Sequence, residues 1–296
     1  MKNFTVLVGN DINNVIKGHS WADLLEELTR YLSVSVNFPP DKPFPLAYEE
    51  IHFKTLKNKI YIEKDIKKFV AKHVLDMNTG PIHQCIMELD CENILTTNYD
   101  LSLEKVFSTA PDTLKNEGFI KESLYSIFRH HISGSKKIWH IHGSANTPQS
   151  ITLGYEHYSG YLQSMRNYVV SGTKDSYKKR SFKPLTKRIK TDDIENISWL
   201  DVFFTKDVHI LGLSLDFNET DLWWLLTYRE KAKHNNLCPI KNDIYYYIPR
   251  EFINSSQSKI DLLLSLGVNI VEQSGYHDNK ITYYSNLISH IHEQYV

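Results

Sequence analysis

The chain has 296 residues, of which 41% are hydrophobic and 23% charged, so its composition is that of a globular protein with one large domain or two modest ones. A formal net charge of −1 provides no overall field to attract nucleic acid or an anionic membrane. Its three cysteines form no CxxC pair and give no support to a disulfide framework or a four-thiolate zinc site. No apolar stretch approaches the roughly eighteen residues of a membrane span, and no cleavable leader is visible, so we expect a cytoplasmic protein.

The first predicted strand covers residues 4–8 and ends at Gly9-Asn10, after which Ser20 is expected to cap an amphipathic helix. Strand, polar turn and helix together are the opening of a nucleotide-binding βα unit. The turn holds Gly9 alone, and no GxGxxG or GxxxxGK[ST] motif occurs in the chain. This argues against a standard dehydrogenase and a P-loop NTPase. Taken alone, the turn is typical of an ordinary βα connection.

The next part of the chain leads to a second strand. Residues 37–50 are rich in proline and predict an exposed connection. Helical spacing then predicts helices over about 60–77 and 82–89. A short apolar run over 94–97 predicts a buried strand, and a further helix is expected after Asp100.

Residues 155–196 are less regular, with tyrosines followed by a basic run and then an acidic stretch. We interpret this segment as a small, solvated helical insert. A docking patch for phosphates, a partner or nucleic acid is the alternative, although the neutral charge balance of the chain disfavours nucleic acid.

Further strands are expected over about 207–215, 244–248 and 268–271, and a C-terminal helix over about 283–293. Strands alternate with helices throughout, which predicts an α/β fold with a parallel sheet flanked by helices. We interpret residues 1–296 as a single domain.

Polar groups end two of the predicted strands: Thr97, Asn98 and Asp100 follow one, and His142 and Gly143 follow another. Ligands bind beyond the carboxyl ends of the strands in an open parallel sheet, so we expect these residues to meet at one rim. Each also has a simpler interpretation. A histidine that ends a strand is usually a satisfied polar residue, and Asp100 could simply cap the helix that follows.

His140 stands two positions before His142, and the period of two along a strand predicts that both lie on the same face. The H-x-H spacing is compatible with a metal site, but no companion ligands follow at a useful spacing. We therefore expect no metal, and a packing or supporting role for His140.

The order and spacing of these motifs resemble the sirtuin-like (silent-information-regulator-like) domain of bacterial antiphage defence proteins. The resemblance spans about residues 4–290. The matching positions are Trp21-x-x-Leu24-Leu25, Thr96 to Asp100, His142-Gly143-Ser144, and Gly212-x-Ser214 followed by Asp221, Trp224 and Arg229. The resemblance implies a Rossmann-like sheet that binds NAD⁺ and cleaves its nicotinamide–ribose bond.

The resemblance also implies roles for single residues. His142 would be the general base, and Asn98 would hold the ribose or the attacking water. The nucleotide would be bound by Gly9, Asn10, Thr97, Asp100, Gly143, Gly212 and Ser214. Cleavage of an N-glycosidic bond passes through an oxocarbenium-like transition state that needs positioned polar groups, and an imidazole with a pKa near 6.5 suits a base at neutral pH.

Deacetylating sirtuins carry two CxxC pairs that bind zinc, and this chain has none, so we expect NAD⁺ as substrate without zinc or another cofactor. The expected function is that of an NAD⁺ glycohydrolase that depletes NAD⁺ in abortive infection. Its expected partners are further copies of itself or an activating defence-system or phage protein, not a membrane or nucleic acid. The alternative is a catalytically degenerate module that binds NAD⁺, ADP-ribose or a partner protein, and the glycine-poor first turn is its best support.

Overall fold

A single sheet organises the molecule. The computed structural model describes residues 3–15, 20–39, 41–57, 61–107, 116–174, 177 and 181–295. The strands of the sheet are β1 (Phe4–Val8), β2 (Asn93–Thr96), β3 (Asn116–Glu117), β4 (His130–Ser133), β5 (Lys136–His140), β6 (Asp207–Leu211), β7 (Ile244–Pro249) and β8 (Val268–Gln273). Their spatial order is β3-β4-β5-β2-β1-β6-β7-β8.

Every neighbouring pair from β5 to β8 in that order is parallel. The six strands of this run, numbered along the chain, have the order 3-2-1-4-5-6 of a Rossmann fold, which confirms the α/β, Rossmann-like expectation. The sheet is not wholly parallel, because β3 and β4 extend it in the antiparallel sense. Gly134, with a φ of 59°, lies in the two-residue hairpin that turns β4 back into β5.

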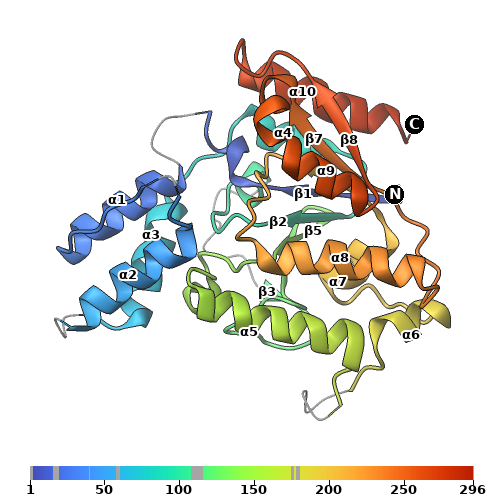
Figure 1. Ribbon diagram of the computed structural model, residues 1–296, viewed down its shortest axis with the longest axis horizontal. Helices are drawn as coiled ribbons and strands as arrows, with labels where there is room; N and C mark the ends of the chain where they lie inside the picture. The colour runs from blue at the N-terminus through green and yellow to red at the C-terminus, as the bar shows by residue number, and fades with distance from the viewer. Residues whose placement is uncertain are drawn as a thin grey trace.

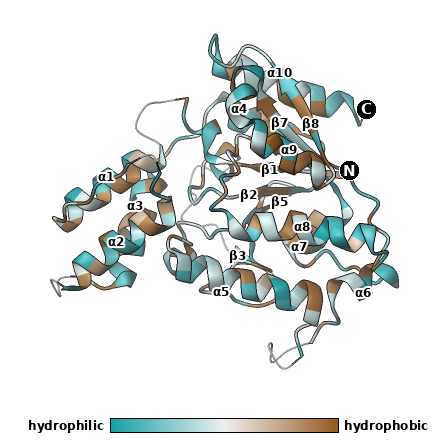
Figure 2. Cartoon of the chain, viewed as in Figure 1, coloured by the Kyte–Doolittle hydropathy of each residue, from teal (hydrophilic) through white to brown (hydrophobic). Residues whose placement is uncertain are grey.

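Helices cover both faces of the sheet (Figure 1). The α-helices are α1 (Trp21–Leu32), α2 (Phe44–Lys57), α3 (Glu63–Leu75), α4 (Pro81–Glu88), α5 (Tyr155–Arg166), α6 (Leu185–Lys190), α7 (Trp199–Thr205), α8 (Thr220–His234), α9 (Gln257–Ser265) and α10 (Lys280–Glu293). Successive strand residues face opposite cores: Leu7 packs with α5, α7 and α8, whereas Val6 packs with α4 and α10. Figure 2 shows hydrophobic and hydrophilic residues mixed along these helices, and the hydrophobic ones contribute to the cores.

Helices α1, α2 and α3 form a lobe beside the sheet, at the left of Figure 1, with a hydrophobic core of its own. The prediction of an exposed connection over residues 37–50 is wrong in its second half, where α2 begins at Phe44. Pro45 is the second residue of that helix, where the missing N–H costs no hydrogen bond. Ala47 and Ile51 then anchor the helix in the core of the lobe.

The helix expected after Asp100 is reduced, among the described residues, to one 3₁₀ turn over Glu104–Val106. Residues 108–115 lie outside the described part of the chain. No helix in the described ranges is both long and apolar enough to cross a membrane.

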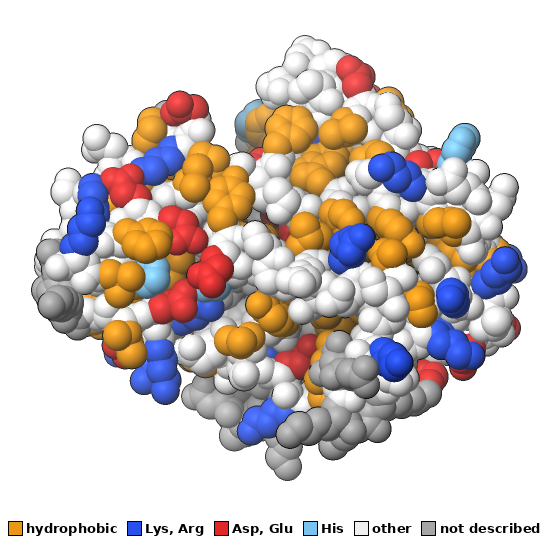
Figure 3. Space-filling model, turned by 60° about the horizontal axis from the view of Figure 1, so that its bottom comes forward, with side chains coloured by type: hydrophobic (Ala, Val, Ile, Leu, Met, Phe, Trp, Pro, Cys, Tyr) orange, Lys and Arg blue, Asp and Glu red, His pale blue; other side chains and the backbone are white. Residues whose placement is uncertain are grey.

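Residues 155–196 are helical in α5, in a π-helical turn over Asn167–Ser171 and in α6. The expectation of a solvated insert is wrong for its aromatic residues, since Tyr161 and Tyr168 are fully buried in the core beneath the sheet. Part of the basic run, residues 178–180, lies outside the described residues. On the face drawn in Figure 3, Lys and Arg side chains are dispersed rather than gathered into one patch.

Candidate active site

A cavity of about 210 Å³ lies at the carboxyl ends of β1, β2 and β6. The strand order reverses between β1 and β6, which is where open α/β sheets bind ligands. Five of the residues predicted from the sequence line it: Asn10, Thr97, His142, Gly212 and Ser214. The other lining residues are Asp11, Asn14, Trp21, Phe44, Pro45, Tyr99, Tyr158, Leu213, Asp216, Asn218 and Glu219.

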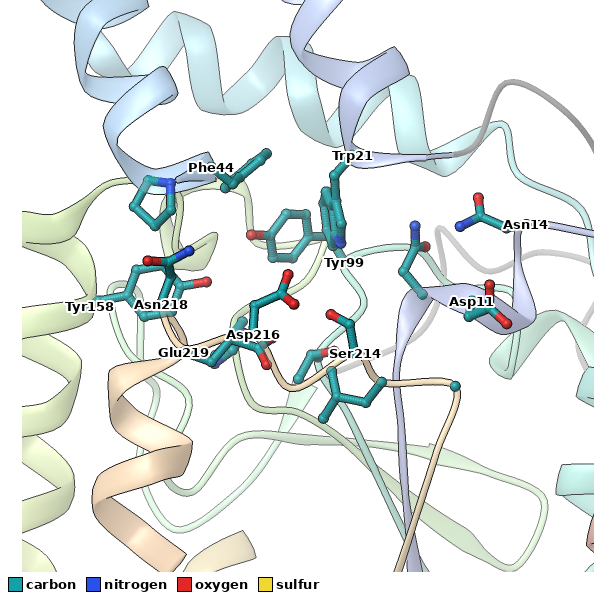
Figure 4. A pocket seen from close by; sticks show the side chains of 16 residues that line it. Asp11, Asn14, Trp21, Phe44, Tyr99, Tyr158, Ser214, Asp216, Asn218 and Glu219 are labelled. Carbon is teal, nitrogen blue, oxygen red and sulfur yellow. The ribbon is translucent and has the colours of Figure 1, made fainter. Parts of the chain in front are cut away.

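The cavity has one aromatic and one polar wall (Figure 4). Trp21 lies at the start of the helical lobe, with its ring centroid 5.0 Å from that of Tyr99 and 5.4 Å from that of Phe44. Residues 216–219, between β6 and α8, supply the carboxylates and the amide of the opposite wall. The helical lobe, which lies beside the sheet, therefore contributes the aromatic wall of the site.

A second cavity, of about 240 Å³, adjoins the first and shares Asp11, Gly212, Leu213 and Ser214 with it. Its far side is lined by tyrosines of β7 and α10, among them Tyr246 and Tyr284. Small-molecule sites usually occupy about 300–1,000 Å³, and the two adjoining cavities together fall in that range.

His142 is the only imidazole among the residues that line the first cavity, and it is 2% exposed. Its Nε2 lies 2.8 Å from Oδ2 of Asp221, at the start of α8. The carboxylate can only accept, so Nε2–H donates and Nδ1 is left to take a proton. Burial disfavours the charged imidazolium, but the negative charge and hydrogen bond of Asp221 outweigh this and raise the pKa of His142. The ring is held from the side by Tyr158, whose centroid lies 5.3 Å away at 78°.

Glu219 is a second ionisable group on the polar wall. Burial raises the pKa of its carboxyl to about 8, even though His142 acts in the opposite direction. Its Oε2 is buried and has no hydrogen-bond partner among the described residues. At neutral pH the cavity therefore presents a protonated carboxylic acid beside His142, whose raised pKa favours uptake of a proton at Nδ1.

Asn98 does not line the cavity; its side chain turns toward the first turn, where Nδ2 donates to the carbonyl oxygen of Gly9 at 3.3 Å. Its backbone N–H donates to Oγ1 of Thr96 at 3.0 Å. The amide Oδ1 is buried and unpartnered within the described residues. Asn98 thus uses a donor within the protein and keeps one buried acceptor without a partner among the described residues.

Asp100 is also outside the lining of this cavity. Its Oδ1 accepts from the backbone N–H of Ser102 at 2.9 Å, and its Oδ2 accepts from Nδ2 of Asn13 at 2.8 Å. Asp100 therefore stabilises the turn that follows β2 and connects it to the turn after β1, in line with the simpler interpretation drawn from the sequence.

Gly9 and Gly143 lie behind the cavity wall, where the neighbouring backbone leaves no room for a side chain. A Cβ at Gly9 would come 2.3 Å from the carbonyl oxygen of Gly212, so this glycine allows β1 and β6 to end side by side. Gly143 has a φ of 94°, and a Cβ there would lie 2.2 Å from the carbonyl oxygen of Ser150. Their predicted part in nucleotide binding stays a prediction.

The expectation that His140 and His142 share a face is wrong. Strand β5 ends at His140, so the alternation of period two does not continue to His142, which lies in the following turn. His140 instead meets two companions that the sequence did not reveal. Its Nε2 lies 2.7 Å from Oε1 of Glu104, and Nδ1 of His131 lies 2.6 Å from the same oxygen.

These three side chains are at most 3% exposed, and their donor atoms all lie within 4.8 Å of one another. Ligand atoms around a tetrahedral zinc ion, with bonds of about 2.0–2.1 Å, lie on the order of 3.3 Å apart. The contacts of Glu104 to His131 and His140 are shorter and fit direct hydrogen bonds. We therefore treat the three residues as a hydrogen-bonded group and name it the His140 cluster.

Asp221 and Glu219 have no role in the sequence analysis, although Asp221 is part of the motif that follows Gly212-x-Ser214. Both follow β6 within ten residues, so their acidic character was the available signal. The contact between Asp221 and His142 joins positions 79 residues apart, so no local spacing in the sequence could reveal it.

Fold and site define an α/β protein with a composite cavity at the switch point of a Rossmann-like sheet. Residues 92–198 match the family model of the SIR2-like domain. The matched segment contains Asn98 and His142 and supports a sirtuin-like family for the chain, as the motifs predicted. No curated protein matches the chain.

Proposed function

We propose that the chain is an NAD⁺ glycohydrolase that cleaves the nicotinamide–ribose bond. The observation that carries the proposal is the buried His142–Asp221 pair, at 2.8 Å, in a cavity at the switch point. A SIR2-like domain is compatible with NAD-related activity, and the matched segment includes this histidine. The activity itself is what the experiment must establish.

In the proposed reaction, His142 Nδ1 accepts a proton from a ribose hydroxyl or from water. Asp221 holds the ring in the tautomer that makes this possible and stabilises the imidazolium that forms. The Asn98 amide oxygen, which has no partner among the described residues, accepts a hydrogen bond from the ribose or the water. Glu219, protonated at neutral pH, donates a hydrogen bond to an oxygen of the bound nucleotide.

The two adjoining cavities suit the two halves of a dinucleotide. We place the nicotinamide ribose beside His142 and the adenosine half in the second cavity, with the diphosphate near Gly212 and Ser214. In keeping with the defence proteins that the chain resembles, we propose that the cellular effect is NAD⁺ depletion during phage infection, after activation by self-assembly or by another protein.

Asp11 favours the second candidate function, a module that binds without turnover, because its side chain lies at the place proposed for the diphosphate. Its carboxylate lies at the junction of the two cavities, where it would face the diphosphate. It accepts hydrogen bonds from Tyr276 and Tyr284 and forms an ion pair with Lys280 at 2.8 Å. These partners compensate its charge and connect the first turn to α10.

Release of nicotinamide from NAD⁺ by the purified chain separates the two candidates, with the His142→Ala protein as control. Cellular NAD⁺ after induced expression, with and without phage challenge, is the companion measurement. Loss of NAD⁺ with wild type alone supports the hydrolase. If neither protein releases nicotinamide under any of these conditions but both bind NAD⁺, the hydrolase proposal fails and the binding module stands.

A further inference from the structure

The His140 cluster lies directly behind Asn98 and is not used by the proposed reaction. Nδ1 of His140 lies 2.7 Å from the backbone carbonyl oxygen of Asn98. On its other side, Nε2 lies 2.7 Å from Oε1 of Glu104. Both partners are oxygen atoms, so the ring is hydrogen-bonded through both of its nitrogens.

This geometry constrains the charge of His140. A peptide carbonyl oxygen can only accept, so Nδ1 must carry a hydrogen. A neutral ring would then turn a lone pair at Nε2 toward the Glu104 carboxylate, which also presents lone pairs. The repulsion is removed when Nε2 is protonated too, and the ring becomes an imidazolium paired with a carboxylate.

The remaining neighbours agree with this assignment. Glu104 Oε1 accepts from His131 as well as from His140, and an oxygen that accepts two N–H bonds is stabilised as an anion. Burial acts against the charge of Glu104, but the two histidines outweigh it and its pKa is lowered. Burial likewise opposes the charge of His140, yet Glu104 raises its pKa, with a further contribution from Asp100. Burial lowers the pKa of His131, so one proton serves the cluster.

We propose that His140, as an imidazolium, is a positioning residue that fixes the Asn98 peptide and, with it, the neighbouring Thr97 and Tyr99 side chains that line the cavity. The inference rests on the proposed function. Asn98 is held at its N–H by Thr96 and at its carbonyl by His140, which leaves its backbone no freedom to turn. His140 itself has no ring nitrogen left for the substrate, because one faces the Asn98 carbonyl and the other faces Glu104.

The charge of His140 is tested by ¹⁵N NMR of histidine-labelled wild-type protein at pH 7.5, with His140→Gln to assign the signals. We expect both ring nitrogens of His140 to be protonated. A neutral tautomer at this pH overturns the inference. Glu104→Gln removes the negative partner and is expected to return His140 to a neutral ring.

The positioning role is tested by steady-state hydrolysis of NAD⁺. In His140→Gln we expect kcat to fall about 10- to 100-fold, as for a misplacement of about 1 Å, while KM changes by less than about threefold. His130→Gln is the matched control, because His130 is the half-buried histidine next to His131 in β4, and its Nδ1 faces the Phe128 carbonyl rather than Glu104 or Asn98. It should retain wild-type kcat. A His140→Gln protein with wild-type kcat overturns the inference.

The Asn98 carbonyl ¹³C signal separates this inference from the proposed function. If wild type does not hydrolyse NAD⁺, the proposed function fails, and the signal still reports whether His140 bonds to that carbonyl. A shift between wild type and His140→Gln, absent in His130→Gln, retains the positioning contact. An unchanged signal overturns it. The ¹³C signal of Asn98 and the ¹⁵N signals of His140 are measured without turnover, so neither measurement requires an active protein.

Discussion

His140 and His142 are the same residue type two positions apart, equally buried, and each faces a carboxylate. They differ in the hydrogen-bond partner of the second ring nitrogen. His140 has an oxygen acceptor on both sides, whereas His142 has Asp221 on one side and lines the cavity. Only His142 can therefore exchange a proton with a ligand.

The difference shows that a carboxylate partner alone does not identify a catalytic histidine. Both pKa values are raised, so pKa does not distinguish them either. The useful observations are whether one nitrogen is uncommitted and whether the ring borders a cavity. The following predictions test this contrast, beginning with the largest expected effect.

His142→Ala is expected to lower kcat for NAD⁺ hydrolysis by about 10²- to 10⁴-fold, because it removes the proposed general base. Binding of NAD⁺, measured by calorimetry, should persist, since the cavity is enlarged rather than filled. A variant with near-normal turnover would remove His142 from the mechanism and leave the two histidines equivalent.

Glu104→Ala is expected to lower the free energy of unfolding by about 3–5 kcal/mol, since it leaves a buried imidazolium and a second buried imidazole N–H without their partner. Asp221→Ala should cost less, about 1–3 kcal/mol, because water in the cavity can replace the lost acceptor of His142. Urea unfolding of both proteins gives the comparison. Equal losses would show that the two carboxylates support the fold alike.

Asp221→Asn should reduce kcat at pH 7.5 by about 10- to 100-fold through the loss of tautomer control. It should also shift the pH profile. The neutral, proton-accepting form of His142 appears as pH rises through its pKa, and Asp221 raises that pKa, so removing the charge moves the acid limb to lower pH. If the acid limb of the pH profile does not move, it reports the titration of a group other than His142.

Glu219→Gln is expected to change kcat at pH 7 by less than about threefold, because glutamine mimics the protonated acid. Burial raises the pKa of Glu219 from its ordinary value of about 4.5 to about 8, so the folded state retains a proton that the unfolded state releases between these values. Wild-type stability therefore falls as pH rises through this window, and the variant should lose that dependence. Thermal unfolding from pH 5 to 9 measures it, and parallel curves would contradict the assignment.

Much of the sheet was predictable from the sequence, because short apolar runs such as residues 4–8 and 244–248 end in turn residues. The prolines of residues 37–50 were misleading. A proline in the interior of a helix breaks it, whereas a proline in the first turn, such as Pro45, is tolerated. Composition alone does not distinguish these two positions.

The site was predictable only in part. His142 and Gly212 were expected at the same rim, and they line the same cavity, since their strands end at one edge of the sheet. The partners of the two histidines were not predictable. Glu104 lies 36 positions before His140 and Asp221 lies 79 positions after His142, so neither contact follows a local spacing.

The link from Asp11 to Tyr276, Lys280 and Tyr284 joins positions 265 to 273 residues apart. The far wall of the second cavity is therefore completed only when α10 has been synthesised and has docked. A nascent chain still on the ribosome lacks this wall, so under the proposed function it would not yet hydrolyse NAD⁺. Chains that stop before residue 276 are expected to be non-toxic for the same reason, even though they retain His142 and Asp221.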